Sequence, residues 1–298
     1  MTPKIELAKP RDFGEIISDT FTFTRQNFKP LLKYFFIFCG FFMLASASTS
    51  VLNQINAVRV MNSLASNNFE TRSPFAALSV FTPTYFLAIL FLLLEYIAIA
   101  VTVLCYLTLY KQKQNNIPKM EEMWGYFKFY FLKIFGSSLL VSLIVIVGCF
   151  FCLIPGIYLY PIMSLVIVIM VVENTNFSYA FNHSFALIKD NWWATFGVFV
   201  VMTIIIAVAS MVVVLPAALL NVVNLFMHLT KGTSISITTA IVTTLLTEVG
   251  HIFHILTIVS TTLIYFNLTE TKEGTGLIER INQFGTNTPD SNITPEEY

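Results

Sequence analysis

Residues 84–110, TYFLAILFLLLEYIAIAVTVLCYLTLY, decide the fold of this chain. The stretch holds one charged residue, Glu95, and it exceeds the roughly 20 residues that a helix needs to cross a hydrocarbon core. Other apolar runs cover about 31–55, 131–153, 157–172, 193–215 and 237–266. The sequence therefore predicts an all-α polytopic membrane protein with about six transmembrane helices.

Composition supports the same fold class. Of the 298 residues, 56% are hydrophobic and 11% are charged, whereas soluble domains carry about 25% charged residues. The segments between the apolar runs are too short to bury a core of their own, so we predict a single membrane domain over residues 1–270. The polar tail, 271–298, is expected to be cytoplasmic and partly disordered. The net charge of zero argues against nucleic acid as a partner.

The distribution of Lys and Arg predicts the orientation. With six spans, fourteen of the seventeen basic residues fall on the side that holds both termini, and only Arg59, Arg72 and Lys231 fall on the other. Basic residues gather in cytoplasmic loops, so we expect a bacterial inner-membrane protein with both termini in the cytoplasm. The first apolar run is too long for a secretory signal, and we expect no cleavable signal peptide.

Prolines mark two expected boundaries. Pro155-Gly156 separates the third and fourth runs and predicts a tight hairpin. Because the fourth run is short, this pair is either a tight hairpin that barely crosses the membrane or a re-entrant element. Pro216 follows the fifth run and is expected to end it, after which residues 217–229 are expected to lie flat on the far side of the membrane.

Amphipathic segments at 12–28, 118–130 and 176–190 predict helices that lie at the membrane surface. The first and last resemble copies of each other at an offset of 164: Thr20 matches Ser184, and Asn27 matches Asn191. Each is followed directly by a span, which predicts an internal parallel repeat. Glu173 precedes the last of these helices and is expected to cap it.

Short motifs carry a family resemblance. Residues 153–160 read LIPGIYLY, residues 171–174 read VVEN, and residues 189–192 read KDNW. This order of a Pro-Gly hairpin, a Glu and an amphipathic helix ending in Lys-x-x-Trp resembles a group of bacterial multi-span proteins. The group includes the YciC-like membrane proteins and the membrane domain of some glycerophosphodiester phosphodiesterases, here in a Bacteroidetes-type version. The resemblance implies no phosphodiesterase activity, because the soluble catalytic barrel of those enzymes is not in this sequence.

The residues that carry candidate chemistry are ionisable groups within the second and sixth apolar runs: Glu95, Glu248, His251 and His254. A charge at the centre of a bilayer costs about 2.5–3.5 kcal/mol on insertion scales and therefore marks a partner or a function. Glu95 and His251 fall at similar depths, so they can meet if the two helices pack together. The Glu248-x-x-His251 step is half of a di-iron carboxylate motif, but the other half is missing.

Three interpretations of this cluster remain open from the sequence. It is a structural hydrogen-bond network between helices, a proton or cation pathway, or a metal site for which Glu248 and His251 are the candidate ligands. We expect no catalytic residues, no cofactor and no bound metal.

The function expected from these features is non-enzymatic. The absence of a soluble catalytic segment from the sequence favours a scaffold or an accessory subunit of a larger membrane assembly. The alternative is a transporter or membrane-lipid-handling protein that uses the Glu/His cluster. The expected partners are membrane lipid and either other membrane subunits or a second copy of the chain.

Overall fold

The computed structural model describes residues 4–65, 81–151, 153–231 and 236–274. All regular secondary structure within these ranges is helical, which confirms the predicted fold class. Six helical stretches of the described chain are long and apolar enough to cross a membrane. The chain is therefore an integral membrane protein.

The described helices follow one another along the chain. They are α1 (Phe13–Gln26), α2 (Phe28–Ala65), α3 (Pro83–Gln112), α4 (Met120–Phe151), α5 (Leu153–Val172), α6 (Phe177–Ile188), α7 (Trp192–Lys231), α8 (Ile237–Gly250), a 3₁₀ turn η3 (His251–Phe253) and α9 (His254–Glu273). The last three form the sixth span.

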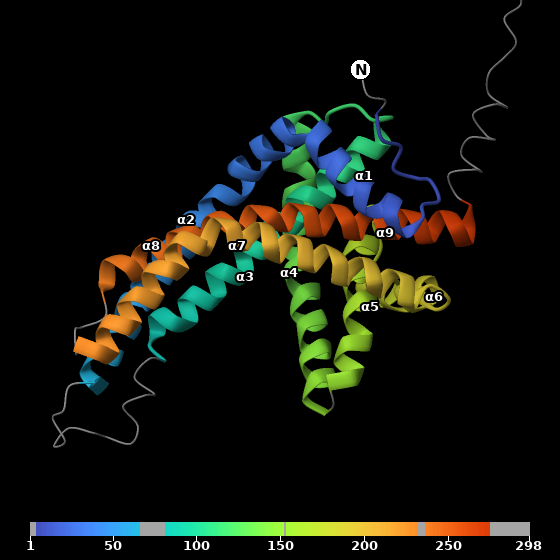
Figure 1. The fold of residues 1–298 in the computed structure, drawn as a ribbon. Coiled ribbons are helices and arrows are strands. Elements are labelled where there is room, and N and C mark those ends of the chain that lie inside the picture. The colour runs from blue at the N-terminus through green and yellow to red at the C-terminus, as the bar shows by residue number, and fades with distance from the viewer. Residues whose placement is uncertain (1–3, 66–80, 152, 232–235, 275–298) are drawn as a thin grey trace, which may run out of the picture.

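The spans form two groups that diverge from a common core (Figure 1). In one group α2 packs along α3, and α8 packs against both α2 and α7; in the other, α4 and α5 form a hairpin. The core lies where the groups meet, because the second half of α3, residues 97–110, is almost wholly buried, and α4, α5 and α9 all contact α3.

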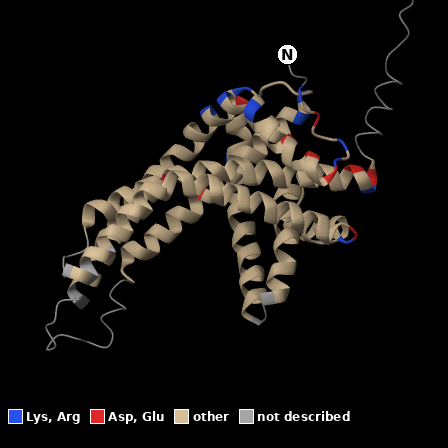
Figure 2. Ribbon diagram, in the orientation of Figure 1, with Lys and Arg blue, Asp and Glu red and all other residues tan. Residues whose placement is uncertain are grey.

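The charge pattern follows the same division. Figure 2 shows long stretches of the spanning helices with few charged residues, and Lys and Arg gathered around α1 and the start of α2. This is the arrangement that the cost of burying charge in hydrocarbon requires. The end of the molecule that carries α1 and the start of α2 therefore lies at a membrane surface.

The α4–α5 hairpin differs from the prediction. Pro155 and Gly156 lie inside the first turns of α5, which begins at Leu153, and α4 ends at Phe151. Proline is accommodated near a helix start because the first N–H groups have no intrahelical partner. The described part of α5 is also long enough to span the membrane.

Two other predicted boundaries are absent. Pro216 lies within α7, which continues to Lys231, because prolines are tolerated in membrane helices where neighbouring groups satisfy the freed backbone atoms. Residues 118–130 do not form a separate surface helix, since α4 runs from Met120 to Phe151. The first turns of α4 are held against α2 instead, with the Phe127 and Phe38 rings stacked at 4.9 Å.

Helices α1 and α6 share more than their sequence pattern. Asp12 caps α1 and Asn176 caps α6, and these two residues are also 164 positions apart. Thr20 and its counterpart Ser184 are both fully buried. The next helices, α2 and α7, begin at the same offset. Caps, buried positions and helix starts at one constant offset are expected if the two segments arose by duplication. The duplication itself stays a prediction.

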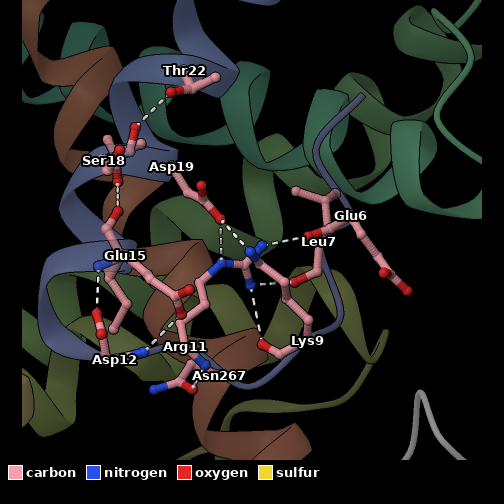
Figure 3. Close-up of polar contacts among 12 residues, drawn as sticks. Glu6, Leu7, Lys9, Arg11, Asp12, Glu15, Ser18, Asp19, Thr22 and Asn267 are labelled. Carbon is pink, nitrogen blue, oxygen red and sulfur yellow. Dashed lines mark hydrogen bonds and ion pairs between the residues drawn. The ribbon is translucent and has the colours of Figure 1, made fainter. Parts of the chain in front are cut away.

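The segment before α1 is fixed by Arg11, whose side chain is fully buried. Its Nε donates to Asp19 at 2.9 Å and its Nη1 to the Leu7 carbonyl at 2.7 Å (Figure 3). The backbone N–H of Arg11 donates to Asn267 of α9 at 2.7 Å. Burial lowers the pKa of the guanidinium, whereas the hydrogen bond and charge of Asp19 oppose that shift. The segment before α1 is therefore held against α9.

We expect Asp19→Asn to destabilise the protein strongly, because it leaves the buried Arg11 charge without its carboxylate. Breaking a buried ion pair by removing one partner typically costs about 3–5 kcal/mol. The measurement is the thermal unfolding midpoint in detergent. Asp190→Asn is the control, since Asp190 is highly exposed and its partner Lys272 lies on the surface; an equal loss in both variants would contradict the prediction.

Gly156 is expected to tolerate no side chain. A Cβ at this position would lie 2.1 Å from Cys149 Sγ and 3.0 Å from the Cys149 backbone nitrogen, so α4 and α5 would have to separate. Overpacking of this kind usually costs about 1–3 kcal/mol. Gly156→Ala should therefore lower the thermal midpoint, whereas Gly136→Ala on α4, where a Cβ meets nothing within 4 Å, should not.

Candidate functional site

The structure brings three of the four predicted intramembrane residues together. Glu95 of α3 is fully buried, and Glu248 of α8 and His251 of η3 are nearly so. His251 Nδ1 lies 3.0 Å from Glu95 Oε1 and 3.4 Å from Glu248 Oε2. Ser46 of α2, which the sequence analysis did not identify, donates to Glu248 Oε1 at 3.2 Å. We call Ser46, Glu95, Glu248 and His251 the buried cluster.

Helix packing explains why these residues meet. Glu248 and His251 are three residues apart, so they share one face of their span. That span packs against α2 and α3, which supply Ser46 and Glu95. All four residues lie well inside their apolar helices, so the cluster sits within the membrane-spanning part of the bundle.

The helix is interrupted at the cluster itself. The regular α-helix ends at Gly250, and His251 opens the 3₁₀ turn η3 before α9 begins at His254. Short 3₁₀ stretches inside long helices often mark hinges or strained functional positions. The interruption was not predicted, because residues 237–266 read as one uniform apolar run.

Two carboxylate oxygens of the cluster lack a hydrogen bond. In the part of the chain that the structure describes, neither Glu95 Oε2 nor Glu248 Oε2 has a hydrogen-bond partner. Glu248 Oε2 does lie in ion-pair range of His251, but Nδ1 can direct its single N–H to only one oxygen, and Glu95 is nearer. Buried polar atoms usually have a hydrogen-bond partner, so these two oxygens are positions at which the cluster can accept a proton or a cation.

His254 stands apart from the carboxylates. Its ring lies against Tyr96, with centroids 4.7 Å apart and the planes nearly perpendicular, and its centroid is 5.9 Å from that of His251. Tyr96 also contacts the His251 ring at 5.3 Å. His254 and Tyr96 therefore form an aromatic wall beside the buried cluster.

The same residues offer a possible metal-binding set. Glu95, Glu248 and His251 can each present one ligand atom, and these atoms lie within 4.8 Å of one another. Two carboxylates and an imidazole are ligands that zinc and manganese accept. Glu95 is therefore a third candidate beside the predicted Glu248 and His251.

A second polar group lies at the end of the spans near the chain termini. Glu173 accepts a hydrogen bond from the Tyr265 hydroxyl at 2.8 Å and lies 3.4 Å from His183 Nε2. The prediction that Glu173 caps α6 is wrong, because Asn176 accepts the hydrogen bond from the Tyr179 N–H at 3.0 Å. Glu173 instead ties α5 to α6 and α9.

No protein-family model, curated protein or solved structure matches this chain. The chemistry of the buried cluster therefore has to be argued from its own geometry.

We expect Glu95 and His251 to be energetically coupled. In a double-mutant cycle of Glu95→Gln, His251→Phe and both together, the stability losses should fall short of additivity by about 0.6–2 kcal/mol, the usual range for hydrogen bonds between membrane helices. The readout is resistance to unfolding in detergent. The same cycle on Glu95 and His254 should be additive, because these two side chains share no hydrogen bond or ion pair.

Proposed function

We propose that this protein is a membrane transporter in which protons bind to and leave the buried cluster. The observation that carries the proposal is the meeting of two buried carboxylates and one imidazole inside the spans, with Glu95 Oε2 and Glu248 Oε2 left without hydrogen bonds. Ionisable residues at this depth commonly form proton relays in pumps and transporters.

Charge counting supports a proton as the ion. With both carboxylates ionised and His251 protonated, the cluster carries one net negative charge. One further proton makes it neutral, which the low dielectric of the membrane interior favours. That proton can reside on either carboxylate, with His251 between them. The cluster can therefore take up and release a proton without moving a helix far.

The surroundings restrict which other groups take part. The titratable side chains beside the cluster are Tyr96 and His254, whose rings contact His251 or each other, and Cys39 of α2, which lies 3.5 Å from Thr102. None of these three side chains is a carboxylate. Glu95, Glu248 and His251 therefore carry the proposed proton transfer.

The turn η3 supplies an element that can have two arrangements. His251 is its first residue, so a change in the charge of the imidazole acts directly on the point where α8 and α9 join. Transporters need such a bistable element to expose a site to one side and then to the other. The metal-binding alternative uses the same three ligands, and His251 of η3 is one of them.

A scaffold or accessory subunit remains the second candidate, and the outer face of α4 favours it. Leu132, Leu143 and Phe150 are 73%, 57% and 85% exposed, so this face meets either lipid or another subunit.

The basic residues near the described ends favour a cytoplasmic placement of those ends in a bacterial inner membrane. Membership of the YciC-like group is likewise a proposal.

Proton uptake into proteoliposomes tests the transport proposal. With an imposed membrane potential and an internal pH-sensitive dye, the wild-type protein should acidify the lumen. Glu95→Gln should slow this uptake by about a hundredfold, as expected for loss of a positioned proton-transfer group. The matched control is Glu121→Gln, because Glu121 is exposed at the start of α4.

Wild-type uptake no faster than in empty liposomes, or equal uptake by Glu95→Gln, would contradict transport and favour the scaffold. Repeating the assay after treatment with a chelator separates the metal alternative. The proposed proton site predicts unchanged uptake and an unchanged thermal midpoint, whereas a metal held by Glu95, Glu248 and His251 predicts the loss of both.

A further inference from the structure

An apolar groove runs between the α1–α2 junction and the start of α9. Its volume is about 800 Å³, and its walls include Phe21 and Phe28 on one side and Ile252, Phe253 and Leu256 on the other. Phe28 belongs to the first span, whereas Ile252, Phe253 and Leu256 belong to the sixth, so the groove lies between two spans. A volume of this size is typical of sites for small organic ligands.

The groove carries positive charge without negative charge. Arg25 and Lys29 line it, and no acidic residue does. Both side chains are exposed, and among the described residues neither forms an ion pair. Other basic side chains of this end do have carboxylate partners, such as Lys9 with Asp19 and Lys113 with Glu122. Arg25 and Lys29 are therefore open to an anion from outside the chain.

The backbone that carries the two cations is fixed in place. Asn27, which lies between them, is buried, and its side-chain amide donates to the Phe23 carbonyl at 3.1 Å. Its Oδ1 accepts a hydrogen bond from the Tyr106 hydroxyl of α3 at 2.8 Å. The junction of α1 and α2 is thus anchored to the core, and the position of the two charges is set before any ligand arrives.

We propose that this groove binds one anionic phospholipid from the surrounding bilayer. The phosphate lies between Arg25 and Lys29, and an acyl chain follows the apolar wall toward Phe253 and Leu256. The charge supports this occupant, because basic pockets between membrane helices bind anionic headgroups. The apolar length supports it as well, because a free phosphate would leave the Ile252–Leu256 wall uncovered.

The proposed lipid site does not depend on the proposal of proton transport. It does lie next to the buried cluster. Ile252 and Phe253 belong to η3, the three-residue turn that begins with His251. A bound acyl chain therefore contacts the same turn that carries the imidazole. The binding test below does not use Glu95, Glu248 or His251, so its failure and a failure of proton transport are distinguishable.

Native mass spectrometry of the purified full chain in a zwitterionic detergent tests the proposal, with phosphatidylglycerol as the probe and phosphatidylcholine as the neutral comparison. We expect one phosphatidylglycerol to be retained preferentially. Replacing both Arg25 and Lys29 by Gln should weaken retention about tenfold or more, given the usual contribution of basic side chains to anionic-lipid binding. The charge-matched control replaces Lys128 and Lys133, which lie over aromatic rings of α4.

A second variant tests the chain-binding wall without changing the charge. Leu256→Trp fills the groove and should also reduce retention of phosphatidylglycerol, while inorganic phosphate should not compete with the lipid. Equal retention of the two lipids by the wild type, retention by the Arg25/Lys29 variant equal to that of the control, or displacement by inorganic phosphate would each overturn the proposal. The thermal midpoint of every variant shows whether it is folded.

Discussion

The absence of water from the hydrocarbon core is the constraint on which the rest of this structure depends. Every backbone N–H and C=O at that depth has to be satisfied within the chain, and the six spans do this as long helices. Where α1 and α6 begin, near the ends of the spans, Asp12 and Asn176 satisfy the first N–H groups with their side chains. The same constraint applies to side chains. The few polar side chains inside the membrane are stabilised by contact with one another, and this explains the buried cluster.

The parts of the fold that were predictable from sequence are those set by local composition. The six spans follow from the length and apolarity of each run, and the approach of Glu95 to His251 follows from their similar depth. The other features depend on residues distant in sequence. Ser46 reaches Glu248 across 202 positions, and the Tyr265 hydroxyl donates to Glu173 across 92. Pro216 did not end its helix, because proline is tolerated within membrane helices more often than within helices in water.

The buried cluster and the lipid groove meet at one short piece of backbone. His251 faces Glu95 on one side of η3, while Ile252 and Phe253 face the groove on the other. This arrangement puts an ionisable group and an apolar ligand surface on consecutive residues. The cluster and the groove are therefore linked by adjacent backbone units of η3. The anchoring of Arg11 to Asn267 and of Asn27 to Tyr106 holds the outer ends of α9 and α1 while this centre adjusts.

The geometry of η3 has a mechanical consequence. A 3₁₀ helix turns about 120° and rises about 2.0 Å per residue, against about 100° and 1.5 Å in an α-helix. Over its three residues, η3 therefore twists α9 by about 60° relative to α8 and lengthens the sixth span by about 1.5 Å compared with an unbroken helix. Converting these three residues to α-helix would rotate α9 about its own axis and shift it slightly toward α8. A different face of α9 would then contact α1, α3 and α5.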